Sequence, residues 1–394
     1  MPLAARPDTA EAALAIGLLR ELVQADSINP PGNTTRAATV ALAALDGMRA
    51  EVIAADSAKP NIVVRLDNGP GPVVHLNAHL DTVPPGDLSA WSVPVHDLTE
   101  TEARLSGLGT GNMKAAAAAM IMALRRLDAA RGAWRGSVIL SLVADECVFG
   151  PDGAAHLLAT RPDLRGEHLI CGEGPGGMNL AVAEKGLMWV RLRAGGRVGQ
   201  GMLTTRGNSA TARLAAALTT IDGWNDLTCK PPLPSLDHSA NSEGMRLSAN
   251  IGRIAGGQGF SPAVSQAEAD IDLRLPPGLT HADMGLRLNA LCADGTLSWH
   301  LIKGWEANWS DPGCAPARAI RAGAIAVRGT SPRDVTRLPA SDAARWRALG
   351  VPSICFGPQP DLASGVDDHV KRQDFLDCIA IYAGAAAHLG HTAE

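Results

Sequence analysis

The strongest constraint on the fold is an alternation of short aliphatic runs with alanine-rich stretches along the chain. Four of these runs have the composition of buried strands, and they lie at residues 73–77, 138–143, 169–171 and 353–356. Between the first two runs, the alanine-rich segment 112–129 predicts a helix with Asn112 as its N-cap. Strands that alternate with helices favour an α/β fold, in which a mainly parallel sheet is flanked by helices.

A different pattern begins near Glu184 and indicates a second, smaller domain of the α+β class. Its predicted strands are 187–194, 245–254 and 267–273, and its predicted helices are 209–219 and 281–292. We therefore expect residues 1–185 and 294–394 to form a catalytic domain, with residues 186–293 inserted between its two parts. With 394 residues, each domain can bury a core of its own.

Charge and cysteine content exclude several classes of function. The formal net charge is −5 and no basic run occurs, which argues against nucleic acid or an anionic membrane as a partner. The seven cysteines form no C-x-x-C pair and are odd in number, so they predict neither a disulfide framework nor a thiolate zinc site. The sequence begins without a secretory signal pattern and has no apolar stretch of bilayer length, so we expect a cytoplasmic protein.

Polar residues follow the predicted strands at the places where a site is expected. In open parallel sheets, ligands bind beyond the carboxyl ends of the strands. The residues at these places are His79, Asp81, Asp145, Glu146, Glu173 and the loop 357–368. A histidine that leaves a strand can present a ring nitrogen to a metal, while an acid two residues later holds its other nitrogen. A hydrogen-bonded structural histidine is the alternative interpretation of His79.

The order of the remaining motifs carries a family resemblance. The motifs are His79-Leu80-Asp81, Gly107-x-Gly109-x-x-Asn112-Met113-Lys114, Asp145-Glu146, Gly172-Glu173, Glu184-Lys185-Gly186, Asp272-x-Arg274 and Ser341-Asp342. Over roughly residues 10–390, the chain resembles the M20-type zinc-dependent amidohydrolases and exopeptidases. This family includes acetylornithine deacetylase, succinyl-diaminopimelate desuccinylase, aminoacylase and carboxypeptidase G. The resemblance implies that the inserted domain is a lid and a dimerisation domain, so a homodimer is expected.

The resemblance also implies a role for single residues. It makes His79 and Glu173 ligands of a first zinc, Asp81 the orienting partner of His79, and Glu146 the general base that activates water. Four positions depart from the family pattern: Asn112 replaces the bridging Asp, Cys147 a ligand Glu, Ser364 the last ligand His, and Gln200 the His that steadies the oxyanion. Arg274 is a candidate clamp for a substrate carboxylate, or else part of a salt bridge within the small domain. Asn112 and Ser364 become candidate substrate contacts.

These replacements limit the metal content that we expect. Two dications about 3.5 Å apart repel by roughly 19 kcal/mol even at an effective dielectric near 20. Only Glu173 remains as a certain anion to offset this repulsion, and an Asn112 amide is a poor bridge between metals. We therefore predict at most one zinc, cobalt or manganese ion, held by His79 and Glu173 with help from Asn112 or Cys147. A metal-free site, with Glu146 still acting as a base, is the alternative.

Three functions remain open from the sequence. The first is a hydrolase of the metallopeptidase and deacylase kind that cleaves an N-acyl or amide bond of a small amino-acid-derived substrate. The second is a metal-independent enzyme of a biosynthetic pathway that catalyses condensation or cyclisation, and the third is a non-catalytic binding protein. Cys147 could also act as a nucleophile with His79 as its base, or it could be a buried spectator thiol.

Overall fold

The computed structural model describes residues 3–233, 236, 243–360 and 365–391 of the chain. The chain divides into two compact units. The first unit comprises Met1–Val182, Ser310–Val335 and Ser341–Glu394, and the second comprises Ala183–Trp309 and Thr336–Ala340. Among the helices described, none has the length and apolar character needed to cross a membrane.

The main sheet follows the strand order β1-β2-β6-β3-β7-β15-β8-β13, with β14 paired to β8. Its centre is parallel, because β3 runs parallel to β6 and to β7, and β15 runs parallel to β7. The outer pairs β1·β2, β2·β6 and β15·β8 are antiparallel. The strands are β1 Ala50–Ile53, β2 Asn61–Asn68, β3 Val73–His79, β6 Gly136–Val143, β7 His168–Cys171, β8 Leu180–Glu184, β13 Asn308–Trp309, β14 Asp334–Arg337 and β15 Ser353–Cys355. A small sheet joins β4 Thr99–Glu100, β5 Arg104–Ser106 and β16 His369–Lys371.

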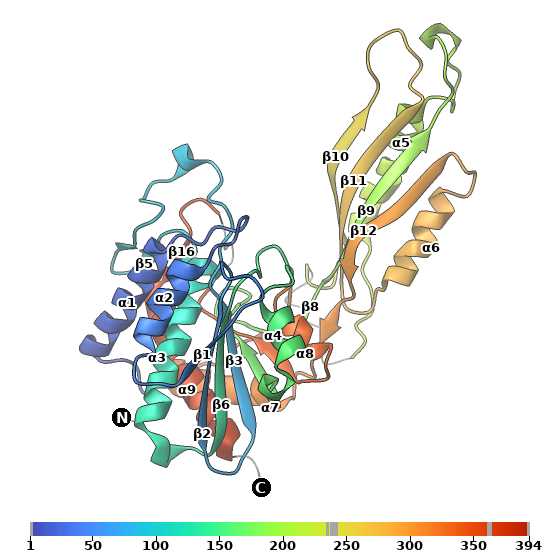
Figure 1. The fold of residues 1–394 in the computed structure, drawn as a ribbon. Helices are drawn as coiled ribbons and strands as arrows, with labels where there is room; N and C mark the ends of the chain where they lie inside the picture. The colour runs from blue at the N-terminus through green and yellow to red at the C-terminus, as the bar shows by residue number, and fades with distance from the viewer. Residues whose placement is uncertain (1–2, 234–235, 237–242, 361–364, 392–394) are drawn as a thin grey trace. The chain divides into compact units, whose positions relative to one another are not determined.

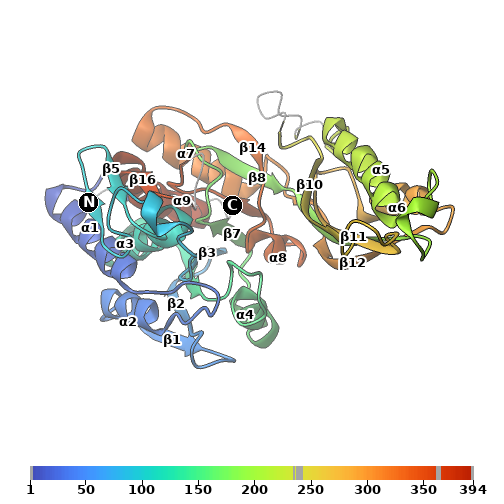
Figure 2. The ribbon, with the colours of Figure 1, turned by 90° about the horizontal axis from the view of Figure 1, so that it is seen from above.

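Helices cover both faces of the main sheet, which confirms the predicted α/β class (Figure 1). The layer formed by α3, α7 and α9 packs on one face, and α4 and α8 pack on the other (Figure 2). Every residue of β6 is buried, as expected of a central strand that is covered on both sides. The helices are α1 Thr9–Gln24, α2 Thr35–Ala44, α3 Ala115–Ala129, α4 Ala154–Thr160, α7 Ala315–Arg328, α8 Ala343–Arg347 and α9 Arg372–His391. Short 3-10 turns lie at Leu88–Ala90, Arg131–Ala133 and Pro162–Leu164.

The start of the alanine-rich helix differs from the prediction. Helix α3 begins at Ala115, and Lys114 is its N-cap. Asn112 lies three residues earlier, in the irregular turn Thr110–Lys114, with non-helical dihedral angles of φ −128° and ψ 87°. The expected N-cap at Asn112 is therefore wrong. The side chain of Asn112 instead lies beside His79, where its Oδ1 is 3.2 Å from Nε2 of the imidazole.

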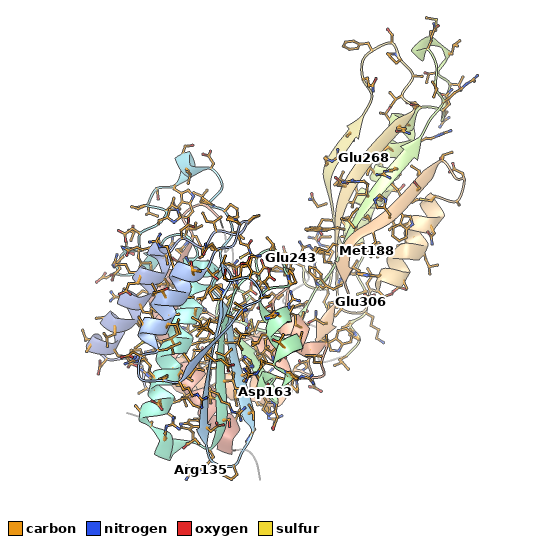
Figure 3. The ribbon with its side chains drawn as sticks, viewed as in Figure 1. Arg135, Asp163, Met188, Glu243, Glu268 and Glu306 are labelled. Atoms are coloured by element: carbon orange, nitrogen blue, oxygen red, sulfur yellow. The ribbon has the colours of Figure 1, made fainter. Side chains whose placement is uncertain are left out.

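The second unit is an antiparallel sheet with two helices. Its strand order is β10-β11-β9-β12, formed by β9 Gly186–Gly195, β10 Ser248–Gly256, β11 Gln266–Leu275 and β12 Leu297–Trp305. The helices are α5 Ala210–Asp222 and α6 His281–Leu291, and 3-10 turns lie at Gly201–Leu203 and Gly223–Asp226. The residues Met188, Val190 and Leu192 of β9 alternate into the core beneath these helices. Glu268, labelled in Figure 3, lies on β11 and forms ion pairs with Arg193 and Arg253 of the neighbouring strands.

The second unit extends further along the chain than the expected segment 186–293. Strand β12 lies beyond residue 293, yet it pairs along its length with β9. Because backbone hydrogen bonds tie β12 to the second unit, this unit continues to Trp309.

Candidate active site

The carboxyl edge of the parallel strands gathers the predicted residues of the first unit. His79 is the last residue of β3, and Glu146 and Glu173 follow the ends of β6 and β7. Since these three strands are adjacent and parallel, their ends meet at one edge of the sheet. All three side chains are buried, with 1%, 4% and 3% of their surfaces exposed.

The imidazole of His79 presents one ring nitrogen to the site. Its Nδ1 lies 2.9 Å from the carbonyl oxygen of Asp81, so Nδ1 carries a proton and donates it to this carbonyl. Its Nε2 lies 3.2 Å from Oδ1 of Asn112 and 3.6 Å from Oε2 of Glu146. A neutral imidazole in this tautomer would place three electron-rich atoms against one another. The arrangement is favourable when Nε2 carries a second proton or when a cation lies among these atoms.

The Asp81 carboxylate fixes the backbone at Glu146 and Cys147 by hydrogen bonds. Its carboxylate accepts hydrogen bonds from the backbone N–H groups of Glu146 (3.2 Å) and Cys147 (3.0 Å), and from the Asn29 amide (2.8 Å). Burial tends to raise the pKa of Asp81, but the interaction with His79 and these donors outweighs burial and lowers it to about 2. The carboxylate is 3.5 Å from Nδ1 of His79, whereas the Asp81 carbonyl makes the closer contact. Asp81 therefore orients the His79 ring through its carbonyl and raises the pKa of His79 through its carboxylate.

A second network of hydrogen bonds and ion pairs, centred on Asp145, stabilises the turn that precedes Glu146. Asp145, with the left-handed φ of 62°, accepts hydrogen bonds from Lys59 (2.7 Å) and from Asn29 (3.2 Å). Lys59 also pairs with Asp152 at 3.1 Å. Because a Cβ on Gly150 would collide with the Asp145 carboxylate, glycine is required there. The network fixes the backbone from which Glu146 projects.

Glu146 occupies an environment suited to a base. Burial raises its pKa well above the usual range, and the nearby charge of Glu173 raises it further. Its Oε1 is buried and has no hydrogen-bond partner among the residues that the structure describes. A buried oxygen of this kind is available to a water molecule, a substrate or a cation.

Asp342 is a site residue whose role the sequence did not reveal. It is buried, and its Oδ1 accepts a hydrogen bond from Arg345 at 3.2 Å. Burial raises its pKa to about 6, with Arg345 and His79 acting in the opposite direction and Glu173 adding to the rise. The pair Ser341-Asp342 was visible as a motif, but nothing in the sequence placed it near His79 and Glu173.

Cys147 lies beside the acids with its thiol protonated. Burial raises the pKa of Cys147 well above its usual range, and the neighbouring Asp81 and Glu146 raise it further. A thiol in this setting is a weak nucleophile, so the environment favours the alternative in which Cys147 is a buried spectator thiol.

The remaining predicted residues lie elsewhere. Gln200 and Arg274 belong to the second unit, so their contribution to the edge of the first unit stays a prediction. Gln200 precedes the 3-10 turn Gly201–Leu203 and forms a bridge with Pro262. Arg274 donates from Nε to both carboxylate oxygens of Asp272, at 3.0 and 3.1 Å. Ser364 lies outside the described residues.

The edge holds donor atoms that could bind a divalent cation. His79, Glu146 and Glu173 offer ligand atoms within 4.8 Å of one another, and so do His79, Asp81 and Cys147. A nitrogen and carboxylate oxygens are ligands that zinc accepts. Both groups use the same histidine, and Asn112 is neutral where a charged bridge would be needed. The residues therefore match part of a metal centre.

Comparison with known proteins identifies the family. The model of Peptidase family M20/M25/M40 matches residues 75–388, so the chain belongs to this family. Succinyl-diaminopimelate desuccinylase of Stenotrophomonas maltophilia is 28% identical over 325 residues, which cover 78% of this chain and 81% of that protein. Acetylornithine deacetylase of Photorhabdus laumondii is 29% identical over 239 residues, which cover 59% of this chain and 57% of that protein.

Solved structures share the fold. An M20 family metallo-carboxypeptidase from Sulfolobus solfataricus superposes with a TM-score of 0.74 at 15% identity, covering 97% of this chain and all of that one. A dinuclear metal-binding M20 peptidase from Bacillus subtilis gives a TM-score of 0.69 at 15% identity, covering 98% of this chain and 100% of that one. The protein is thus a hydrolase of the M20 family, as the motif order predicted. Members of this family typically bind two metal ions.

Proposed function

We propose that this protein is an amidohydrolase that cleaves an N-acyl or amide bond of a small amino-acid-derived molecule, with Glu146 as general base. The observation that carries the proposal is the convergence of His79 Nε2, Asn112 Oδ1 and Glu146 Oε2 at a buried edge. The desuccinylase and deacetylase relatives support this substrate class.

His79 and Glu173 would hold one zinc, cobalt or manganese ion, with Asn112 Oδ1 or Cys147 Sγ as a further donor. When bound, the ion would polarise the carbonyl group of the amide and stabilise the charge that develops on its oxygen. The neutral amide of Asn112 and the protonated thiol of Cys147 leave less negative charge than two dications require. A single ion therefore suits this site better than a pair.

The residues of the chain supply the proton transfers. Glu146 takes a proton from the attacking water and delivers it to the leaving nitrogen, because its unpartnered Oε1 is free to accept a hydrogen bond. Asp81 fixes the Glu146 backbone and, through its carbonyl, the orientation of His79. Arg274 is the proposed clamp for a substrate carboxylate, and Gln200 is the proposed amide donor to the oxyanion.

Metal analysis combined with a substrate panel tests the proposal. Protein purified without chelators is expected to contain about one metal ion per chain and to hydrolyse N-acetyl or N-succinyl amino acids. Treatment with a chelator should abolish the activity, and zinc, cobalt or manganese should restore it. If no N-acyl amino acid or dipeptide is cleaved with any of these metals, the proposal is wrong.

A further inference from the structure

Gln359 connects two loops at the carboxyl edge of the sheet. It belongs to the segment that follows β15, is buried with 3% of its surface exposed, and lies opposite the loop that follows β7. Its Oε1 accepts a hydrogen bond from the backbone N–H of Gly174 at 2.6 Å. Its Nε2 donates to the carbonyl oxygen of Gly172 at 3.2 Å. The two bonds bracket Glu173, one on each side.

The amide of Gln359 continues the strand pairing where the strands themselves end. Strands β7 and β15 are in parallel register up to Cys171 and Cys355, and the Phe356 N–H then donates to the Cys171 carbonyl at 2.9 Å. Beyond this point the backbone of the β15 segment makes no such bond to Gly172 or Gly174 among the interactions that the structure describes. The Gln359 side chain takes over this role for the next two peptide groups.

The chemistry of an amide explains why glutamine suits this position. The Gly174 N–H already donates to the Gly172 carbonyl at 3.0 Å, and the Gln359 amide adds a second acceptor for this N–H and a donor for this carbonyl. A flipped amide would set donor against donor and acceptor against acceptor, so the hydrogen-bond pattern fixes its orientation. Glycine at position 174 permits the approach, because a Cβ there would lie 2.6 Å from Gln359 Oε1 and 2.5 Å from the Gly357 carbonyl.

We propose that Gln359 is a positioning residue, which holds the backbone on both sides of Glu173 and thereby fixes the carboxylate of Glu173 beside His79. Outer partners of this kind commonly set metal affinity, and removing one lowers the affinity by about 10- to 100-fold. The consequence for metal binding rests on the proposed function, whereas the effect on the loop backbone does not.

The test compares Gln359→Met with the wild-type protein in two measurements. Hydrogen exchange of the segment 172–176, followed by mass spectrometry, should become faster in the variant, because the Gly174 N–H loses its shorter hydrogen bond and keeps only the one to the Gly172 carbonyl at 3.0 Å. The affinity for zinc, measured by competition with a chromophoric chelator, should fall by about 10- to 100-fold. Gln373→Met is the matched control, since the Gln373 amide bonds to Asp377 on helix α9 and should change neither quantity.

Two further variants keep the outcome decisive. Gln359→Glu retains an acceptor for the Gly174 N–H and should keep the exchange of this segment close to wild type. Gln359→Asn keeps the amide but shortens its reach by one methylene, so it should show both changes even where Gln359→Met does not fold. Unchanged exchange in Gln359→Met and Gln359→Asn would overturn the inference. A wild-type protein that binds no zinc would instead overturn the proposed function, and exchange alone would then decide the role of Gln359.

Discussion

Two histidines on strand β3 occupy similar positions, and their pKa values are shifted in opposite directions. His75 lies within the strand and His79 at its end, four residues apart on the same face, and both are buried. His75 donates from Nδ1 to the Leu164 carbonyl at 2.8 Å and accepts at Nε2 from the Ser141 hydroxyl at 2.7 Å. Both of these partners are neutral. The partners of His79 include the acids Asp81 and Glu146.

The difference in partners reverses the effect of burial. Burial lowers the pKa of His75 to about 4, because its neutral partners do not compensate for the loss of water. Burial acts on His79 in the same direction, but Asp81 and then Glu146 outweigh it and raise the pKa of His79 to about 10. The body of the strand therefore keeps its histidine neutral, whereas the carboxyl edge favours a positive charge. The edge is where a positive charge is stabilised.

Removing the base at the edge should have the largest effect on activity. Glu146→Gln keeps the size of the side chain but cannot accept a proton, so the rate of hydrolysis should fall by about 10²- to 10⁴-fold. The measurement is the initial rate on an N-acyl amino acid. The exposed Glu102→Gln is the control and should retain wild-type activity. A Glu146→Gln enzyme with more than a tenth of the wild-type rate would show that another group is the base.

Adding acids at the carboxyl edge of the sheet should increase the number of metal ions that it binds. The double variant Asn112→Asp with Cys147→Glu adds two carboxylates beside His79, which offset the repulsion between paired dications. The zinc content should rise from about one to about two ions per chain, measured by elemental analysis after dialysis. A content that stays at one would show that charge is not what limits the site.

The low pKa of His75 should make the stability of the protein depend on pH. The folded pKa of His75 is about 4, below the ordinary value of 6.5, so the unfolded chain binds the additional proton between these values. The contribution of His75 to the free energy of unfolding is therefore fully present above pH 6.5 and declines by about 3 kcal/mol as the pH falls to 4.

A difference measurement isolates this contribution from the other titrating groups. The free energy of unfolding is measured by urea denaturation at pH 7 and pH 4 for the wild type and for His75→Gln. The advantage of the wild type over His75→Gln should shrink as the pH falls. An advantage that does not change with pH would contradict the neutral state of His75.

The smallest effect, a loss of stability, is expected from removing the ion pair between Lys59 and Asp145. Lys59→Met removes a cation from Asp145, which retains its bonds to Asn29 and to the Asp152 N–H, so the loss of stability should be about 1–2 kcal/mol. Lys59→Arg is the control and should recover most of this loss. If Lys59→Met is as stable as the wild type, the Asp145 network does not depend on its ion pair.

The sequence predicted the elements whose pattern is local. The runs at 73–77, 138–143 and 169–171 and most of the run at 353–356 are strands, because each is a short, mainly apolar run that needs cover on both faces. Strand β12 was missed although Leu297, Trp299 and Leu301 alternate with polar residues, since most of its residues are exposed and the alternation is short. Asn112 was expected to cap a helix because its local position suits a cap. Its side chain lies instead beside His79, which is distant in the sequence.

By itself the sequence determined the family, the α/β class and the order in which His79, Glu146 and Glu173 leave their strands, because these depend on residue type and local spacing. Only the tertiary structure decided which atoms face one another, that Asp342 joins the acids and that the Gln359 amide brackets Glu173. It also decided that the pKa values of two histidines of one strand are shifted in opposite directions. The reason is physical: a pKa or a hydrogen bond depends on burial and on distances of a few ångströms between segments that are far apart in the chain.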